Sequence, residues 1–500
     1  MQTWLKVSFI LLGLSANVSA QESLQHNLLF PENQNFSHTA FRPAFVKTDE
    51  KGLFNIIGNK VEININPAFD LLYGSSSENI SRLGYGADLQ LKHKKWDAGF
   101  TYMHSRGEYL EYQTDFIREN RVVPAMGVSS GKDKIQANYM NAFVNFKASN
   151  IFSFELGYGR QFIGEGYRSL LRSDFGNASP YLKIQTSFWN IQYTNLFAIH
   201  ENIYNIEGEK EFYQRKFSAT HFLDWKIARW ISIGLFETVI WQNNQGGYNR
   251  GFDVNYLNPV IFYRPVEFST GSADNVMIGA NLKLKPIKNH TLYFQLLFDE
   301  FLLDELKADF NQWRNPDQDI RSGWWANKYG IQLGWKANNI FKINGLSALA
   351  EFNIVRPYTY AHTNPSQSYS HYNLSLAHPL EANFHEFVSL LSYQKKHWRM
   401  AVRYNQSLSG NSPLGTNYGD NLQLSNTSRT KEYENFIGQG VERRVNYLDA
   451  NISYLIVPNW KAALSLGYLW REERLQSRTQ NERMLYLRFR TNLFNQYFDF

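Results

Sequence analysis

Apolar and polar residues alternate along most of this chain with a period of two. In one segment the apolar phase consists of Val276, Ile278, Ala280, Leu282 and Leu284, while Asn275, Gly279, Asn281, Lys283 and Lys285 form the other phase. Successive side chains of a β-strand point to opposite faces, so this alternation is typical of strands with one apolar face and one polar face. The pattern predicts an all-β protein.

Eighteen segments carry this alternation or continue it. The predicted strands are 59–72, 82–92, 96–105, 134–147, 151–159, 180–188, 190–199, 214–225, 230–241, 274–285, 290–299, 326–336, 345–354, 384–394, 397–408, 445–456, 460–473 and 483–493. Boundaries read in this way shift by about two to four residues, so a count of sixteen also fits. Pro259 and Pro265 argue against a further strand at 258–263, because proline cannot donate a ladder hydrogen bond.

The links between these segments alternate between short and long. Short links are 93–95, 149–150, 287–289, 395–396 and 457–459, and the long ones are 106–133, 160–179, 200–213, 242–273, 300–325, 355–383 and 409–444. Bacterial outer-membrane barrels have short periplasmic turns and long extracellular loops, whereas a soluble β-sandwich has no reason to keep this asymmetry. The sequence therefore predicts a transmembrane outer-membrane antiparallel β-barrel of about 18 strands, its lumen occluded by long extracellular loops.

Composition narrows the class further. The chain has 37 Phe, 30 Tyr and 13 Trp but only 19% charged residues, which excludes a disordered chain. Its mean hydropathy of −0.44 excludes a bundle of membrane helices, and the absence of cysteine excludes disulfides and thiolate chemistry. Six aromatic residues near predicted strand ends are expected to form interfacial girdles: Tyr447, Tyr454, Trp460, Tyr468, Trp470 and Tyr486.

The two ends of the chain carry export signals. Residues 1–20 combine Lys6, an apolar stretch and a small-residue site ending at Ala20, as a cleaved signal peptide does. Residues 21–58 are expected to form a periplasmic or plug segment, and residues 59–500 the barrel. The ending Tyr497-Phe498-Asp499-Phe500 resembles the signal recognised by barrel-assembly machinery. Basic residues are spread along the chain without a patch, so nucleic acid is excluded as a partner.

The link 160–179 has the most unusual composition. Arg160, Arg168 and Arg172 alternate with Glu165 and Asp174 among several glycines, and such residues can form bidentate ion pairs. One interpretation is a structural, inward-folded loop held by salt bridges. The other is that the free arginines, together with Tyr167, contact an anionic glycan at the outer mouth.

The residues of this link resemble a known family. Gly159-Arg160, Ile163-Gly164-Glu165-Gly166, Leu170-Leu171-Arg172-Ser173 and Asn177-Ala178-Ser179-Pro180 are similar to a characteristic block of the capsule assembly Wzi family. A second block is carried by Asn258-Pro259, Asp274-Asn275, Gly279, Tyr293, Gln295 and Asp299-Glu300, and 258–268 and 297–301 resemble the gliding-motility RemB-like branch more closely.

The resemblance implies an eighteen-stranded outer-membrane barrel, occluded by its loops, that binds capsular polysaccharide. Members of the family carry an N-terminal periplasmic helical bundle, which residues 21–58 are too short to supply. In the predicted topology Asp274, Asn275, Asp299 and Glu300 lie at the same extracellular end as link 160–179. This convergence indicates a binding surface or a plug.

Three functions follow from these observations. The first is attachment or organisation of surface polysaccharide, within gliding-motility or other cell-surface machinery, with outer-membrane lipid, lipopolysaccharide and gliding or export proteins as partners. The second is a channel for anionic or sugar solutes, favoured by inward Lys283, Lys285, Arg488 and Arg490. The third is a barrel enzyme, but the sequence contains none of the common catalytic motifs. Its nearest candidates are His221, His385-Glu386 and Asp299-Glu300, and adjacent strand residues point to opposite faces. We expect no enzymatic activity and no cofactor.

Overall fold

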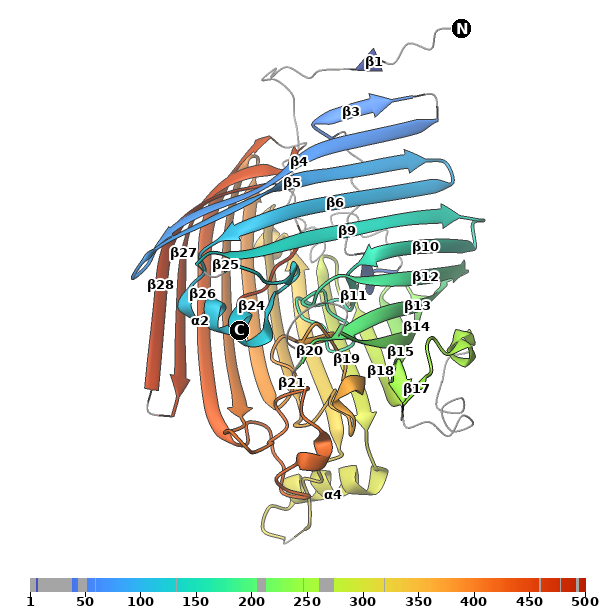
Figure 1. The fold of residues 1–500 in the computed structure, drawn as a ribbon, viewed down its shortest axis with the longest axis vertical. Helices are drawn as coiled ribbons and strands as arrows, with labels where there is room; N and C mark the ends of the chain where they lie inside the picture. Colours follow the sequence, from blue (N-terminus) through green and yellow to red (C-terminus); the bar gives the residue numbers. More distant parts are fainter. Residues whose placement is uncertain are drawn as a thin grey trace.

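Eighteen antiparallel strands form a closed barrel (Figure 1). The computed structural model describes residues 6–7, 38–43, 52–58, 60–131, 133–204, 213–245, 247–259, 274–318, 320–457, 460–476, 478–491 and 494–500. The barrel strands are β4 (Val61–Ser75), β5 (Asn79–His93), β6 (Trp96–Gly107), β9 (Ile135–Lys147), β10 (Phe152–Gly159), β12 (Ser179–Phe188), β13 (Ile191–Asn202), β14 (Gln214–Ala228), β15 (Ile231–Gln242), β18 (Asn275–Leu284), β19 (His290–Glu300), β20 (Lys328–Asn338), β21 (Leu346–Val355), β24 (Phe384–Lys395), β25 (Trp398–Asn411), β26 (Val441–Val457), β27 (Ala462–Leu475) and β28 (Arg478–Arg490).

Each barrel strand pairs with the next one along the chain, and the last pairs with the first. The closing ladder joins β28 to β4 from Leu485↔Ser75 to Arg490↔Asp70. The other half of β4 pairs on that side with β3 (Phe54–Ile57), which in turn pairs with β1 (Lys6–Val7). The predicted antiparallel barrel of eighteen strands is therefore confirmed, and every predicted strand overlaps an observed one.

Smaller elements lie in the links between the barrel strands and, for β2, in the N-terminal segment. They are β2 (Phe41–Pro43), β7 (Val122–Val123), β8 (Gly127–Val128), β11 (Gln161–Ile163), β16 (Asn244–Gln245), β17 (Tyr248–Asn249), β22 (Ser370–His371), β23 (Leu374–Ser375), the helices α2 (Glu111–Asn120) and α4 (Leu303–Arg314), and the 3₁₀ turns η2 (Val254–Leu257), η3 (Ile340–Lys342), η4 (Pro365–Gln367) and η5 (Asn426–Ser428). The strand-based sequence pattern does not predict the two α-helices. No helix among the described residues has the length and apolar character needed to cross a membrane.

The two faces of the wall differ as the alternation predicts. In β19, Leu292 is 41% exposed on the outside, whereas Gln295 and Asp299 are buried in the lumen. Large apolar side chains are exposed on the outside of strands all around the barrel, for example Leu83, Leu156, Leu235, Leu333, Leu391, Leu466 and Leu487. A soluble monomer does not expose so much apolar surface, so this outer face is the one that lipid would cover.

Two of the expected girdle residues are placed differently. Tyr447 and Tyr486 are buried in the lumen, 3% and 8% exposed, and do not face lipid. The alternation along each strand explains this. Tyr447 lies on the same face of its strand as Asp449, and Tyr486 lies on the same face as Met484 and Arg488, so both side chains point inward. The expectation that they form part of a girdle was wrong.

The terminal segments and one loop are described only in part. Of the predicted signal peptide, all but Lys6 and Val7 lie outside the described residues, so cleavage after Ala20 stays a prediction. Residues 38–43 and 52–58 are the described part of segment 21–58. In the link 242–273, residues 247–259 are mostly exposed apart from Tyr256, which packs on Trp241, and residues 246 and 260–273 lie outside the described residues.

Candidate functional site in the barrel lumen

The link between β10 and β12 turns into the barrel. Every residue from Gly159 to Ser179 is buried. Within it, β11 pairs with β2, so the N-terminal residues 41–43 run alongside it in the lumen. We call residues 160–179 the inward loop. Its arginines are therefore buried contacts inside the barrel and are not exposed at an outer mouth.

Arg168 is the centre of the contacts that hold the inward loop. Its side chain is 1% exposed and lies 2.9 Å from Glu386 Oε1 on β24 and 3.1 Å from Asp499 Oδ1. The main-chain N–H groups of Tyr167 and Arg168 donate to the two carboxylate oxygens of Glu351 on β21, at 2.8 and 3.0 Å. A buried guanidinium is stable only when opposite charges and acceptors surround it, and this arrangement supplies them.

Residues 494–500 fold back into the lumen beside the inward loop. Asp499 accepts hydrogen bonds from the Tyr167 hydroxyl at 2.6 Å and from Asn405 Nδ2 at 2.7 Å. Tyr497 donates to Asp174 Oδ1 at 2.8 Å. The C-terminal aromatic residues, which the sequence analysis compared with an assembly signal, lie beyond β28, and Phe500 is buried. Whether barrel-assembly machinery reads them stays a prediction.

Glu165 joins the inward loop to the opposite wall. Its carboxylate lies 3.1 Å from Lys283 Nζ on β18 and 3.3 Å from Lys336 Nζ on β20, and Thr39 donates to it from the N-terminal segment. Burial acts to raise the pKa of Glu165, but the two lysines outweigh burial and lower it to about 2. The carboxylate is ionised, and it ties three parts of the chain together.

The other predicted residues of the inward loop are also held. Arg160 donates to the main-chain oxygens of Asp174 and Asn495. Asn495 in turn donates to the Asp174 carboxylate at 3.0 Å. Arg172 is 3% exposed, and its main-chain oxygen accepts from the Ile163 N–H. The side-chain contacts of Arg160 and Arg168 favour the structural interpretation for these two arginines.

The second predicted block lies at the ends of β18 and β19, where it contacts the link 355–383. Asp274 pairs with Arg250 at 2.8 Å and accepts from Gln367 at 3.1 Å, and Asn275 Nδ2 donates to the Gln367 carbonyl at 2.9 Å. Asp299 accepts from the Tyr360 N–H at 2.8 Å. Glu300 is 38% exposed and lies 3.4 Å from Lys328 Nζ, which is also 3.9 Å from Asp299.

The two blocks are joined by a residue that the sequence analysis did not single out. Tyr360 donates its N–H to Asp299 and its hydroxyl to the Leu170 carbonyl of the inward loop at 2.7 Å. Gln295 on β19 adds a second link, because its Oε1 accepts from the Leu170 N–H at 2.9 Å. The predicted convergence of the two blocks is therefore real, and link 355–383 mediates it.

Of the residues considered as catalytic candidates, Glu386 belongs to this network. Glu386 accepts from His378 Nε2 at 2.7 Å as well as from Arg168, whereas His385 lies on the other face of β24 next to Phe352. His221 is 3.8 Å from Glu237. Within the described part of the chain, no three His, Cys, Asp or Glu side chains are arranged to hold a metal ion.

A glycine makes the closest approach of the inward loop possible. A Cβ added to Gly166 would lie 2.0 Å from Glu351 Oε2 and 2.9 Å from the Tyr293 ring. Any side chain there would displace the carboxylate that binds the next two main-chain N–H groups.

Replacing Arg168 with Ala is expected to loosen the inward loop. The change removes one cation from two buried carboxylates, a loss of about 3–5 kcal/mol for a buried ion pair. Amide hydrogen exchange over residues 160–179 should accelerate, and Arg168→Lys should give an intermediate rate because it keeps the charge without the guanidinium fork. Arg444→Ala, at an exposed pair, is the matched control. Unchanged exchange in Arg168→Ala would contradict this assignment.

Acid is expected to weaken the Glu165 contacts. The pKa of Glu165 is lower in the folded chain than its ordinary value of 4.5, so its stabilisation is complete above pH 4.5 and is lost as the pH falls towards about 2. Hydrogen exchange of β11, measured from pH 6 to pH 2.5, should be slower in the wild type than in Glu165→Gln at the upper end and converge at the lower end. A constant difference would show that Glu165 does not contribute in this way.

No protein-family model matches this chain, and no curated protein does. Among solved structures, Wzi of Escherichia coli, described as an outer-membrane protein of group 1 capsule assembly and a carbohydrate-binding β-barrel, superposes with a TM-score of 0.51 at 11% identity, over 86% of this chain and 85% of that one. OprD of Pseudomonas aeruginosa gives a TM-score of 0.43 at 11% identity, over 89% and 98%. OccAB2 of Acinetobacter baumannii gives 0.42 at 8% identity, over 85% and 97%. At 11% identity the likeness to Wzi concerns the fold alone, and this chain has the fold of the outer-membrane β-barrels.

Proposed function

We propose that this protein is a non-enzymatic outer-membrane barrel that binds or organises surface polysaccharide at its long-loop mouth while its lumen stays closed. The observation that carries the proposal is the complete burial of residues 159–179 inside the barrel. Ion pairs and hydrogen bonds to β18, β20, β21 and β24 fix this loop. A loop held in this way occupies the lumen, which favours a closed barrel over an open pore.

The likeness to Wzi supports the same function. Wzi is described as carbohydrate-binding, and it shares this fold over most of both chains. The sequence resemblance at residues 159–180 points in the same direction. A role within gliding-motility machinery is the most specific part of the proposal. It rests only on the sequences of residues 258–268 and 297–301, which resemble the RemB-like branch.

Helix α4 offers a surface suited to sugar rings. It lies in the long link 300–325 at the bottom end of the barrel in Figure 1, which the link lengths predict to be extracellular, and none of its residues is buried. Phe310 and Trp313 are 55% and 76% exposed, with ring centroids 5.7 Å apart. Neighbouring exposed aromatic rings are uncommon on a surface without a binding role, and their faces can stack on the C–H faces of a sugar.

The position of α4 is fixed by its other side. Asp309 accepts a hydrogen bond from Asn327 at 2.9 Å and lies 3.6 Å from Arg356, and the Tyr433 hydroxyl donates to Glu305 at 3.0 Å. Arg321 lies over the Tyr433 ring at 3.6 Å and adds a positive charge to this set of contacts. A polysaccharide that carries acidic sugars is the ligand that we propose for this surface.

Removing the aromatic pair is expected to weaken polysaccharide binding. Phe310→Ala with Trp313→Ala should raise the dissociation constant for an acidic capsular polysaccharide about tenfold, since aromatic contacts contribute about 0.5–1.5 kcal/mol each. Binding would be measured on the purified barrel in detergent. Leu414→Ala removes a fully exposed apolar side chain from another long link and serves as the control. Equal binding by all variants would rule out α4 as the contact surface.

Reconstituted protein is expected to show little steady conductance. The inward loop, link 355–383 and residues 494–500 contact each other in the lumen through Tyr360, Asp499 and Tyr497. Single-channel recording in planar bilayers tests this directly. Steady channels of nanosiemens size would favour the alternative function, a channel for anionic or sugar solutes, and would overturn the closed lumen.

A further inference from the structure

The end of the barrel away from α4 carries a surface that the proposed function does not use (Figure 1). Eight turns join neighbouring barrel strands at this end, and the link lengths predict that they are periplasmic. Their sequences contain eight Lys or Arg residues and no Asp or Glu, although the whole chain has 51 basic and 45 acidic residues. We call these turns the short-turn rim: residues 94–95, 148–151, 189–190, 229–230, 285–289, 339–345, 396–397 and 458–461.

Most cations of the short-turn rim are exposed and have no acidic partner. None of the following five forms an ion pair with a described residue, and all are exposed: Lys95, Arg229, Lys288, Lys342 and Lys396. Successive turns lie two strands apart around the wall, roughly 10 Å, which is about one screening length in physiological salt. Their positive charges therefore add up along the rim.

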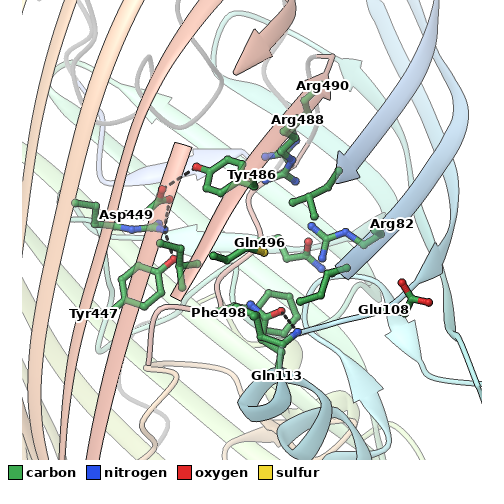
Figure 2. A pocket seen from close by; sticks show the side chains of 16 residues that line it. Arg82, Glu108, Gln113, Tyr447, Asp449, Tyr486, Arg488, Arg490, Gln496 and Phe498 are labelled. Atoms are coloured by element: carbon green, nitrogen blue, oxygen red, sulfur yellow. Dashed lines mark hydrogen bonds and ion pairs between the residues drawn. The ribbon is translucent and has the colours of Figure 1, made fainter. Parts of the chain in front are cut away.

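Cations inside the barrel differ, because acidic residues of the chain compensate them. Arg488 pairs with Asp70 at 2.6 Å, and Arg403 lies 3.2 Å from Asp449. Figure 2 shows that Asp449 also accepts from the Tyr486 hydroxyl, at 2.7 Å. These luminal arginines therefore have acidic partners within the chain, whereas the exposed cations of the short-turn rim have none in its described part. An anionic surface outside the chain would complete them.

Exposed aromatic rings lie beside these cations. Trp96, Trp230 and Phe341 are each the sequence neighbour of a rim cation, and Phe341 is 88% exposed. Trp398 packs edge-on against Tyr454, with ring centroids 4.9 Å apart, and both rings are exposed. Aromatic residues of membrane proteins gather at the level of the lipid headgroups. The neighbouring Lys and Arg side chains are long enough to reach the phosphates at that level.

We propose that the short-turn rim binds anionic phospholipid headgroups, such as phosphatidylglycerol, in preference to zwitterionic ones. Lys and Arg side chains near a membrane surface are attracted to anionic lipid. The exposed rings favour a lipid over a soluble acidic protein, because the headgroup region also takes up their apolar faces. This inference does not depend on polysaccharide binding, since it concerns the opposite end of the barrel and other residues.

The test is quenching of tryptophan fluorescence in the full-length barrel, reconstituted in phosphatidylcholine vesicles that contain a brominated lipid. Brominated phosphatidylglycerol should quench as a lipid bound about fivefold more tightly than brominated phosphatidylcholine, the ratio expected for one cation acting on one anionic headgroup. The ratio should fall towards one in about 1 M NaCl, where the screening length is roughly 3 Å.

Two variants locate the preference. The rim variant combines five substitutions: Lys95→Gln, Arg229→Gln, Lys288→Gln, Lys342→Gln and Lys396→Gln. It should lose the preference for phosphatidylglycerol. The control variant removes five exposed cations at the long-loop end: Arg106→Gln, Lys431→Gln, Arg444→Gln, Arg474→Gln and Arg478→Gln. It has the same net charge as the rim variant and should keep the preference. Heat-modifiable migration in gel electrophoresis verifies that each variant has folded.

Every other result overturns the proposal. Equal quenching by the two lipids would show that the rim does not select anionic headgroups, and a preference retained in the rim variant would place the selection elsewhere. A preference lost equally in the control variant would show that total charge, and not the rim, is responsible. Binding of soluble polyglutamate by the wild type in neutral detergent, without a lipid preference, would assign the rim to an acidic protein instead.

Discussion

Closure of the hydrogen-bond ladder is the constraint on which this structure depends. In hydrocarbon no water replaces a missing hydrogen bond, so an unpaired main-chain N–H or C=O group destabilises the fold by roughly several kcal/mol. A sheet in a membrane must therefore close on itself. Here β28 meets β4 to complete the ring. Once the wall is closed, outward positions are apolar, inward positions are polar, and the charged loops have only the lumen in which to be buried.

The wall could be predicted from the sequence because its signal is local. A strand such as β19 alternates Leu292, Phe294, Leu296 and Phe298 with inward residues, and the alternation needs no knowledge of neighbouring strands. The same rule places Tyr447 and Tyr486 in the lumen. The girdle expectation was wrong for them because it used their position near a strand end and not the face of the strand on which they lie. The helices α2 and α4 lie in links where that signal is absent.

The luminal site could be predicted only in part. The arginines and acids of the inward loop lie close together in the sequence, and this is enough to predict a network of ion pairs. The partners of Arg168 are Glu386 and Asp499, more than two hundred residues away. No local pattern links them, because the contact arises from barrel curvature and from the return of residues 494–500 into the lumen. The role of Tyr360 was missed for the same reason.

The six residue pairs of the seam between β28 and β4 have a consequence for assembly. Residues 494–500 follow this closing strand almost at once, yet they lie inside, against Tyr167 and Asp174. Because a barrel is open at its ends, this tail can enter the lumen after the seam has formed. Its contacts then join the end of the chain to a loop encoded more than three hundred residues earlier.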